Sequence, residues 1–180
     1  MSSRILVDEI YGKTANTSAA TIGSNGLFKA RTCAFRMYPN AAQSLAHGTV
    51  TVLNFTNTSF DSDNLVDLSN NKVVITAATA GLWYLDVTFR MSNTVAYRQT
   101  TQILVTGSAI VQGEQGFYSQ TTGAYPSCNA HTLHELSSGD EITFTGYQAY
   151  GSARNTYVNG GLSTLSLIHI SEPTRPRSIA

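Results

Sequence analysis

The segment at residues 81–91 (GLWYLDVTFRM) limits the possible folds of this chain more than any other. Its odd-numbered positions from 83 to 91 are all apolar, whereas the even-numbered positions carry Leu, Tyr, Asp, Thr and Arg. Because successive side chains of a strand point to opposite faces, this spacing predicts one long strand with a buried apolar face. The segment at 141–150 repeats the pattern after a turn at 138–140, with Ile142 and Phe144 inward. Both segments predict antiparallel β structure.

Short alternating runs recur from residue 31 onward, separated by Gly, Asn and Asp. The predicted strands span residues 33–38, 49–55, 72–76, 81–91, 99–105, 108–112, 130–136 and 141–150. The predicted turns fall at residues 38–40, 47–48, 61–64, 69–71, 106–107, 138–140 and 159–161. Many short strands with such turns, and no helical period, predict an all-β antiparallel sandwich or jelly roll.

The chain is long enough for one well-cored domain and too short for two comfortable ones. Residues 1–30 are small, polar and glycine-bearing after a short strand-like opening, which predicts an N-terminal β-arm or linker. Residues 31–164 form the predicted domain. Eleven basic and eleven acidic residues balance, so nucleic acid and anionic membranes are disfavoured as partners. We identify neither a signal peptide nor a membrane-spanning run, which predicts synthesis in the cytoplasm without membrane insertion.

The C-terminal residues 165–175 (LSLIHISEPTR) resemble the conceptual translation of a transposase adapter used to prepare sequencing libraries. We therefore predict that residues 165–180 are an adapter-derived artefact, and that the native sequence continues differently from about Thr164 with the last strand of the sheet. The string LSLIHI nevertheless alternates like a strand. The alternative is a genuine terminal strand, since STLSLI is reasonable β sequence.

The order of three stretches resembles the C1q/TNF-like jelly roll over most of residues 34–164. They are residues 34–55, residues 60–89 and residues 136–150. A glycine followed by large apolar residues at alternate positions is typical of the family, and so is a later Leu-x-x-Gly-Asp before alternating apolar residues. The core signature residues are Gly81, Trp83, Leu85, Val87, Phe89, Gly139, Asp140, Ile142 and Phe144.

The chain departs from the family pattern at Ile75, Ala78, Trp83 and Leu85, all of which are plausible core or turn substitutions. No collagen-like stalk precedes the domain, so a complement-type role in an animal is not expected. The opening SRILVDEIYGKTANTSAATIGSNGL instead resembles virion structural proteins of environmental bacteriophages. This resemblance implies a virion protein made in the host cytoplasm, attached to other virion proteins through its N-terminal arm and extracellular after release.

Few residues suggest metal binding or catalysis. Asp61, Asp63 and Asp67 are the weak metal candidates for calcium, but they lack the spacing of an EF-hand, and we favour turn formation. His131 and His134 stand three apart on a predicted strand and so face opposite sides. We find no catalytic motif, and predict no enzyme activity and no cofactor.

Cys33 and Cys128 have neither a zinc nor a thioredoxin spacing. We favour buried free thiols, although the sequence leaves a disulfide open. His47, before Gly48, suits a turn better than catalysis.

Two predicted loops, residues 113–126 and 147–157, combine Tyr with Ser, Gly, Asn and Gln, which suits adaptable recognition. The receptor-binding candidates are Tyr118, Tyr125, Tyr150 and Tyr157. The alternative is that some of them pack in a subunit interface.

The family resemblance implies a homotrimeric, non-enzymatic knob, in which a host surface glycan or protein is bound by avidity. A capsid decoration or fibre protein that recognises no host molecule is the first alternative. A bacterial C1q-like adhesin is the second.

Overall fold

The computed structural model describes residues 9–11, 18–22, 28–30, 33–92, 98–116, 127–158 and 165–169. The chain divides into two compact units, Met1–Thr32 and Cys33–Ala180. The first unit contains a three-stranded antiparallel sheet of β1 (Glu9–Tyr11), β2 (Ser18–Ile22) and β3 (Phe28–Ala30). No helix in the described ranges is long and apolar enough to cross a membrane.

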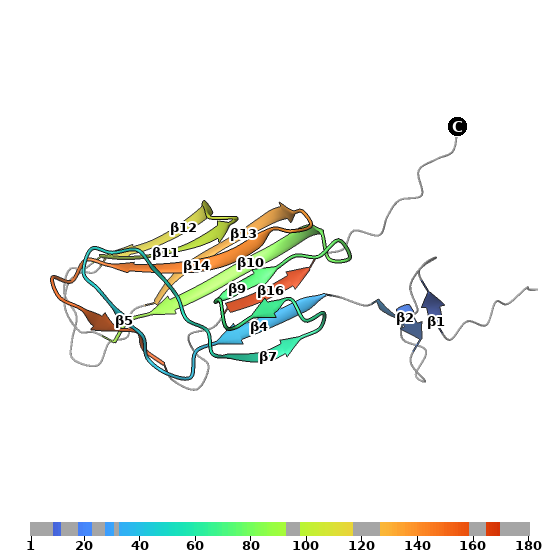
Figure 1. Ribbon diagram of the computed structural model, residues 1–180, viewed down its shortest axis with the longest axis horizontal. Coiled ribbons are helices and arrows are strands. Elements are labelled where there is room, and N and C mark those ends of the chain that lie inside the picture. The colour runs from blue at the N-terminus through green and yellow to red at the C-terminus, as the bar shows by residue number, and fades with distance from the viewer. Residues whose placement is uncertain are drawn as a thin grey trace, which may run out of the picture. The chain divides into compact units, whose positions relative to one another are not determined.

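The second unit is a sandwich of two antiparallel sheets (Figure 1). The five-stranded sheet has the spatial order β13 (Ser127–Leu136), β10 (Gly81–Arg90), β16 (Leu165–His169), β4 (Ala34–Tyr38) and β7 (Asn57–Asp61). The six-stranded sheet contains β12 (Ser108–Gly116), β11 (Arg98–Val105), β14 (Glu141–Gln148), β9 (Lys72–Val74) and β8 (Val66–Asp67), with β6 (Thr51–Val52) on β14. The short strands β5 (Ser44–Leu45) and β15 (Arg154–Asn155) pair with each other. The predicted all-β antiparallel sandwich is confirmed.

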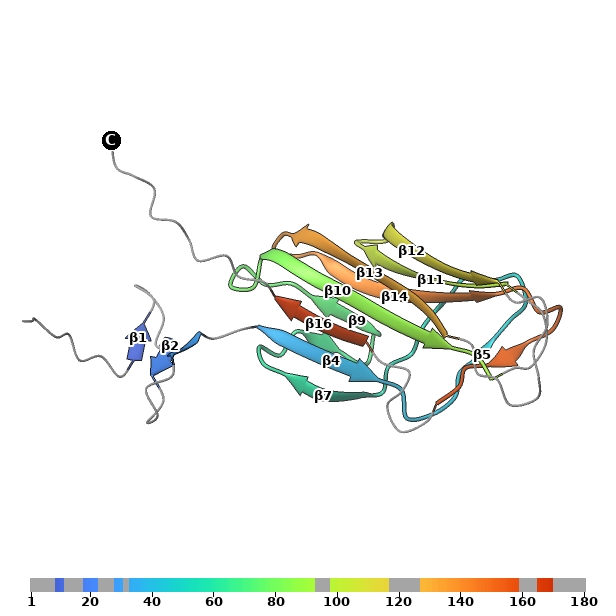
Figure 2. The same ribbon diagram turned by 180° about the vertical axis from the view of Figure 1, so that it is seen from behind.

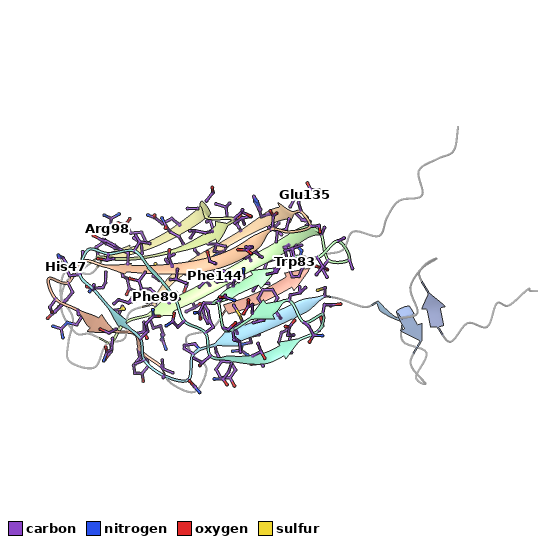
Figure 3. All side chains as sticks on the ribbon, viewed as in Figure 1. His47, Trp83, Phe89, Arg98, Glu135 and Phe144 are labelled. Atoms are coloured by element: carbon purple, nitrogen blue, oxygen red, sulfur yellow. The ribbon has the colours of Figure 1, made fainter. Side chains whose placement is uncertain are left out.

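The core lies between these two sheets and is centred on β10. The inward residues of β10, Trp83, Leu85, Val87 and Phe89, are at most 2% exposed. Phe89 on β10 and Phe144 on β14 belong to the same cluster, one from each sheet (Figure 3). The indole Nε1 of Trp83 donates a hydrogen bond to the Thr79 carbonyl at 2.9 Å, so its one polar atom is satisfied inside the core.

Backbone hydrogen bonds connect the turn before β14 to Ile75, the residue that follows β9. Gly139 has a φ of 93°, which a residue with a Cβ rarely adopts. Its N–H donates to the Ile75 carbonyl at 2.8 Å, and the Ile75 N–H donates to the Asp140 carbonyl at 2.9 Å. The Asp140 carboxylate also accepts from the Ser137 N–H at 2.8 Å. This turn therefore fixes where β14 enters the sandwich.

Strand β16 lies between β10 and β4, near the middle of the five-stranded sheet (Figure 2). Leu165 pairs with Val87 on one side and with Met37 on the other. β10 and β4 run parallel to each other because each pairs antiparallel with β16. The strand at residues 165–169 thus supplies hydrogen-bonding partners to both neighbours.

Several predicted boundaries were wrong. The strand predicted at 49–55 is reduced to Thr51–Val52, although the Leu53 N–H still donates to the Phe144 carbonyl at 2.8 Å. The strand predicted at 108–112 continues to Gly116, because its partner β11 begins at Arg98 and pairs with it along its length. β14 ends at Gln148, not at residue 150. The polar edge strand β7 (NTSFD) was missed because it has no apolar alternation.

We expect a chain truncated after Thr164 to lose cooperative unfolding. Its β4 and β10 would face each other across an empty strand position, and each buried unpaired backbone group costs about 1–3 kcal/mol. Thermal unfolding followed by circular dichroism measures this. A chain ending after His169 keeps β16 and is the matched control. Equal melting temperatures for the two truncations would contradict the expectation.

Candidate functional site

One end of the sandwich carries the loop that follows β14, part of the predicted recognition surface. The side chain of Gln148 is fully buried and anchors this loop. Its Nε2 donates to the Leu45 carbonyl at 3.0 Å and to the Ser152 carbonyl at 2.9 Å, and its Oε1 accepts from the Tyr150 N–H at 2.7 Å. One amide therefore binds three backbone groups, two in this loop and one in β5.

The second half of this loop is held by β5 and its flanks. Arg154 pairs with Leu45 in the β15–β5 ladder. The Gln43 N–H donates to Thr156 Oγ1 at 2.9 Å, and the Thr156 N–H donates to the Gln43 carbonyl at 2.8 Å. Residues 148–156 are thus fixed by contacts to a segment about a hundred residues earlier.

His47 caps the same end. Its Nδ1 accepts a hydrogen bond from the Gly151 N–H at 2.9 Å. Gly48 follows with a φ of 70°, so this is a turn, and its N–H donates to the Gln148 carbonyl at 2.9 Å. His47 and Arg98 are labelled at this end in Figure 3, whereas Trp83 and Glu135 lie at the other end.

Two arginine–tyrosine pairs occupy this end. The guanidinium carbon of Arg154 lies 3.7 Å from the centre of the Tyr150 ring, and that of Arg98 lies 5.9 Å from the centre of the Tyr147 ring. Arg98 also forms an ion pair with Glu114 at 2.8 Å. The two arginine–tyrosine distances are within the range of a cation–π contact.

The structure describes two of the four tyrosine candidates. Tyr150 and Tyr157 are half-buried, and Tyr150 lies under Arg154. Tyr118 and Tyr125 fall outside the described residues. Arg154 carries no sequence signal, because a spacing of four residues has no meaning in a strand and its place follows from the β15–β5 pairing.

The acidic candidates bind the backbone of their own turns. Asp61 accepts from the N–H groups of Leu65 and Val66, each at 3.0 Å. Side-chain hydrogen bonds lower the pKa of Asp67 to about 2; the bond from Ser69 has the largest effect and the bond from Asn70 the next.

Asp63 accepts from the Ser62 hydroxyl at 2.7 Å. Within the ranges that the structure describes, no three His, Cys, Asp or Glu side chains are grouped to hold a metal ion.

The two cysteines are free and buried. Burial, and after it a hydrogen bond with Asp63, raises the pKa of Cys33 to about 12. Burial is also the main cause that raises the pKa of Cys128 to about 11. Such thiols stay protonated near neutral pH and are poor nucleophiles.

The two histidines of β13 point to opposite faces. His131 is exposed and pairs with Asp86, whereas His134 is half-buried and pairs with Trp83.

The outer face of the five-stranded sheet is a second candidate surface. Tyr84 on β10 pairs with Leu133 on β13, and the Leu133 side chain is 56% exposed. The Tyr84 ring lies 6.4 Å from the ring of His131. On β7, Phe60 is 48% exposed and pairs with Arg36 of β4. Large apolar and aromatic side chains are therefore present at both edges of this face.

Charged groups on this outer face are partly removed from water. Burial raises the pKa of Asp86, and the charge of His131 beside it acts in the opposite direction. The Nε of Arg36 is buried, and no hydrogen-bond partner is found for it among the described residues.

A small cavity lies near the end of β10. It has a volume of about 20 Å³ and is lined by Leu53, Phe55, Phe89, Arg90 and others. This is room for about one water molecule, not for a sugar or a nucleotide.

Comparison with known proteins found no matching family model and no matching curated protein. Solved structures do match. Eiger TNF from S. frugiperda aligns over 83% of this chain and 99% of its own, with 12% identity and a TM-score of 0.61. Murine APRIL at pH 5.0 covers 78% of this chain and 100% of its own, with 15% identity and a TM-score of 0.57. The globular domain of zebrafish complement 1qA covers 77% and 98%, with 11% identity and a TM-score of 0.55.

We expect the Asp86→Asn variant to melt a few degrees higher than the original chain at about pH 7, and at the same temperature at about pH 3. The raised pKa means that folding favours the protonated carboxyl. The stability that the protonated Asp86 contributes is present below the pKa of this group in the unfolded chain. It is lost as the pH rises through the higher pKa of the same group in the folded chain.

Melting curves at the two pH values measure this difference. Glu135→Gln, which removes an exposed carboxylate from β13, is the control. A lower melting temperature of Asp86→Asn at neutral pH would contradict the expectation.

Proposed function

We propose that this chain, which has the C1q/TNF-like jelly-roll fold, is a non-enzymatic binding module that assembles as a homotrimer. The observation that carries the proposal is the outer face of the five-stranded sheet. Monomeric soluble proteins rarely expose a large contiguous apolar surface, and such surfaces mark contact sites. Tyr84 and Leu133 are neighbours in the β10–β13 ladder and supply apolar surface at one edge of this face, and Phe60 on β7 supplies it at the other edge.

A second copy of the same chain is the partner we infer for this face. The face carries both an acidic group, Asp86, and basic groups, Arg36 and His131. Because the charges of this face are mixed in sign, copies arranged around a three-fold axis do not bring together surfaces of a single charge. A trimer buries this face around its axis and leaves the ends of each sandwich accessible.

The end loops suit the binding role. Cys33 is the first residue of the second unit and directly precedes β4. At this end of the sandwich the ring centres of Phe35 and Trp83 lie 6.1 Å apart. The loop with Tyr150 and His47 lies at the opposite end. Attachment at one end and recognition at the other allow three weak contacts to act together.

We further propose that the module belongs to a bacteriophage virion, as a tail-fibre tip or another host-facing appendage that binds a surface glycan or protein. The N-terminal arm would bind other virion proteins. The support is the resemblance of residues 3–27 to virion structural proteins. The alternatives are a capsid decoration or fibre protein without a host ligand, and a bacterial adhesin.

We expect the full chain to elute at three times its 19.3 kDa chain mass in size-exclusion chromatography with light scattering. Leu133→Glu places a charge on the apolar face and is expected to give one chain mass with an unchanged circular dichroism spectrum. Val52→Glu, at a 42% exposed apolar residue of β6, is the control and should remain trimeric. A monomeric original chain, or a trimeric Leu133→Glu variant, would refute the assembly.

Long-read sequencing of the source DNA across the codons from Gly161 onward, and into both neighbouring genes, tests the virion proposal. We expect LSLIHISEPTR to be replaced by a native strand, with tail or capsid genes beside it. If the string persists among bacterial genes, the adapter interpretation is wrong and the adhesin becomes the favoured function.

A further inference from the structure

We propose that Arg154 and Tyr150 form a binding site for a sugar carboxylate, so that the ligand of this module is an acidic polysaccharide. The inference rests on the proposed binding function and names its ligand class. It starts from the surroundings of Arg154 at the end of the sandwich.

Arg154 is a half-buried cation for which the described residues supply no compensating anion. Its Nε is buried with no hydrogen-bond partner, and no ion pair of its guanidinium is found among the described residues. Burial of a charge without a partner costs free energy. A bound anion at the accessible part of the guanidinium would remove part of this cost.

The guanidinium is also held in one place. Arg154 sits in the β15–β5 ladder opposite Leu45, and its guanidinium lies 3.7 Å from the centre of the Tyr150 ring. The Tyr150 backbone is fixed in turn by the buried Gln148 side chain. A site that is ordered before the ligand arrives loses less entropy on binding.

Arg98 at the same end differs in both respects. Glu114 neutralises it at 2.8 Å, and it lies 5.9 Å from the Tyr147 ring. Arg98 is 53% exposed, so its ion pair is a surface one. Both arginines lie over a tyrosine ring, but Arg98 forms an ion pair with a carboxylate and Arg154 forms none with the described residues. Arg98 is therefore a matched control.

The chemistry of the pair selects the ligand class. A guanidinium presents parallel N–H groups that match the two oxygens of a carboxylate. The Tyr150 ring is half-buried against the core beside this cation, and its accessible part adds an apolar surface that a sugar ring can contact. A neutral sugar would satisfy only the ring, and an inorganic anion only the cation. A uronic-acid type of residue satisfies both.

The test uses biolayer interferometry of the full chain with immobilised oligogalacturonate, and with its methyl ester as the uncharged probe. We expect the original chain to bind the acid at least about tenfold more tightly than the ester, since hydrogen bonds to charged groups have that magnitude. Arg154→Gln should lose this difference. Arg154→Lys keeps the charge without the planar fork and should lose most of it, whereas Arg98→Gln should stay within about twofold of the original.

Equal binding of acid and ester, or an unchanged Arg154→Gln variant with a native melting curve, would overturn the inference. Equal loss in Arg98→Gln would reduce the effect to general charge and also overturn it. Equal binding of a glycerol-phosphate polymer would reject the carboxylate as the ligand group. Light scattering on the same samples reports assembly separately, so a trimer that binds neutral glycans or host cells but not polyuronate leaves the proposed function intact.

Discussion

The buried face of β10 is the constraint on which the rest of the sandwich depends. Trp83, Leu85 and Val87 are not exposed at all, and the strand pairs along its whole length with β13. Its apolar face needs a second sheet above it, which β11 and β14 provide through Ile103 and Phe144. Because the opposite face of the strand remains half-exposed, the same ten residues create both the core and the surface proposed for assembly.

Strand β10 also sets the requirement for a last strand. It runs parallel to β4 with one strand position between them, and only an antiparallel strand can pair with both edges there. Backbone hydrogen bonds carry this pairing and do not depend on side-chain identity. A segment of about five residues with strand-like alternation can therefore fill the position, which reconciles a foreign origin of residues 165–169 with an ordered β16.

The alternating segments were predictable because their information is local. The strands at 81–90 and 141–148 follow directly from the period of two. The polar strand β7 and the short strand β15 could not be found, because each exists through its partner alone. The geometry of the end loop depends on Gln148 and Leu45, which lie 103 residues apart. No sequence pattern marks such a contact, so Tyr150 was a candidate for its residue type alone and Arg154 was not a candidate.

The outer sheet face and the end loop differ in the kind of partner that their residues can bind. The outer face of the five-stranded sheet offers area and shape, with its charges mixed in sign, which suits a copy of itself. The end loop offers one oriented guanidinium on an aromatic ring, which suits a small anionic group. A single such contact is weak. Three copies around one axis would present three Arg154 sites toward the same side, and a polymer with repeated carboxylates is the ligand that can use them together.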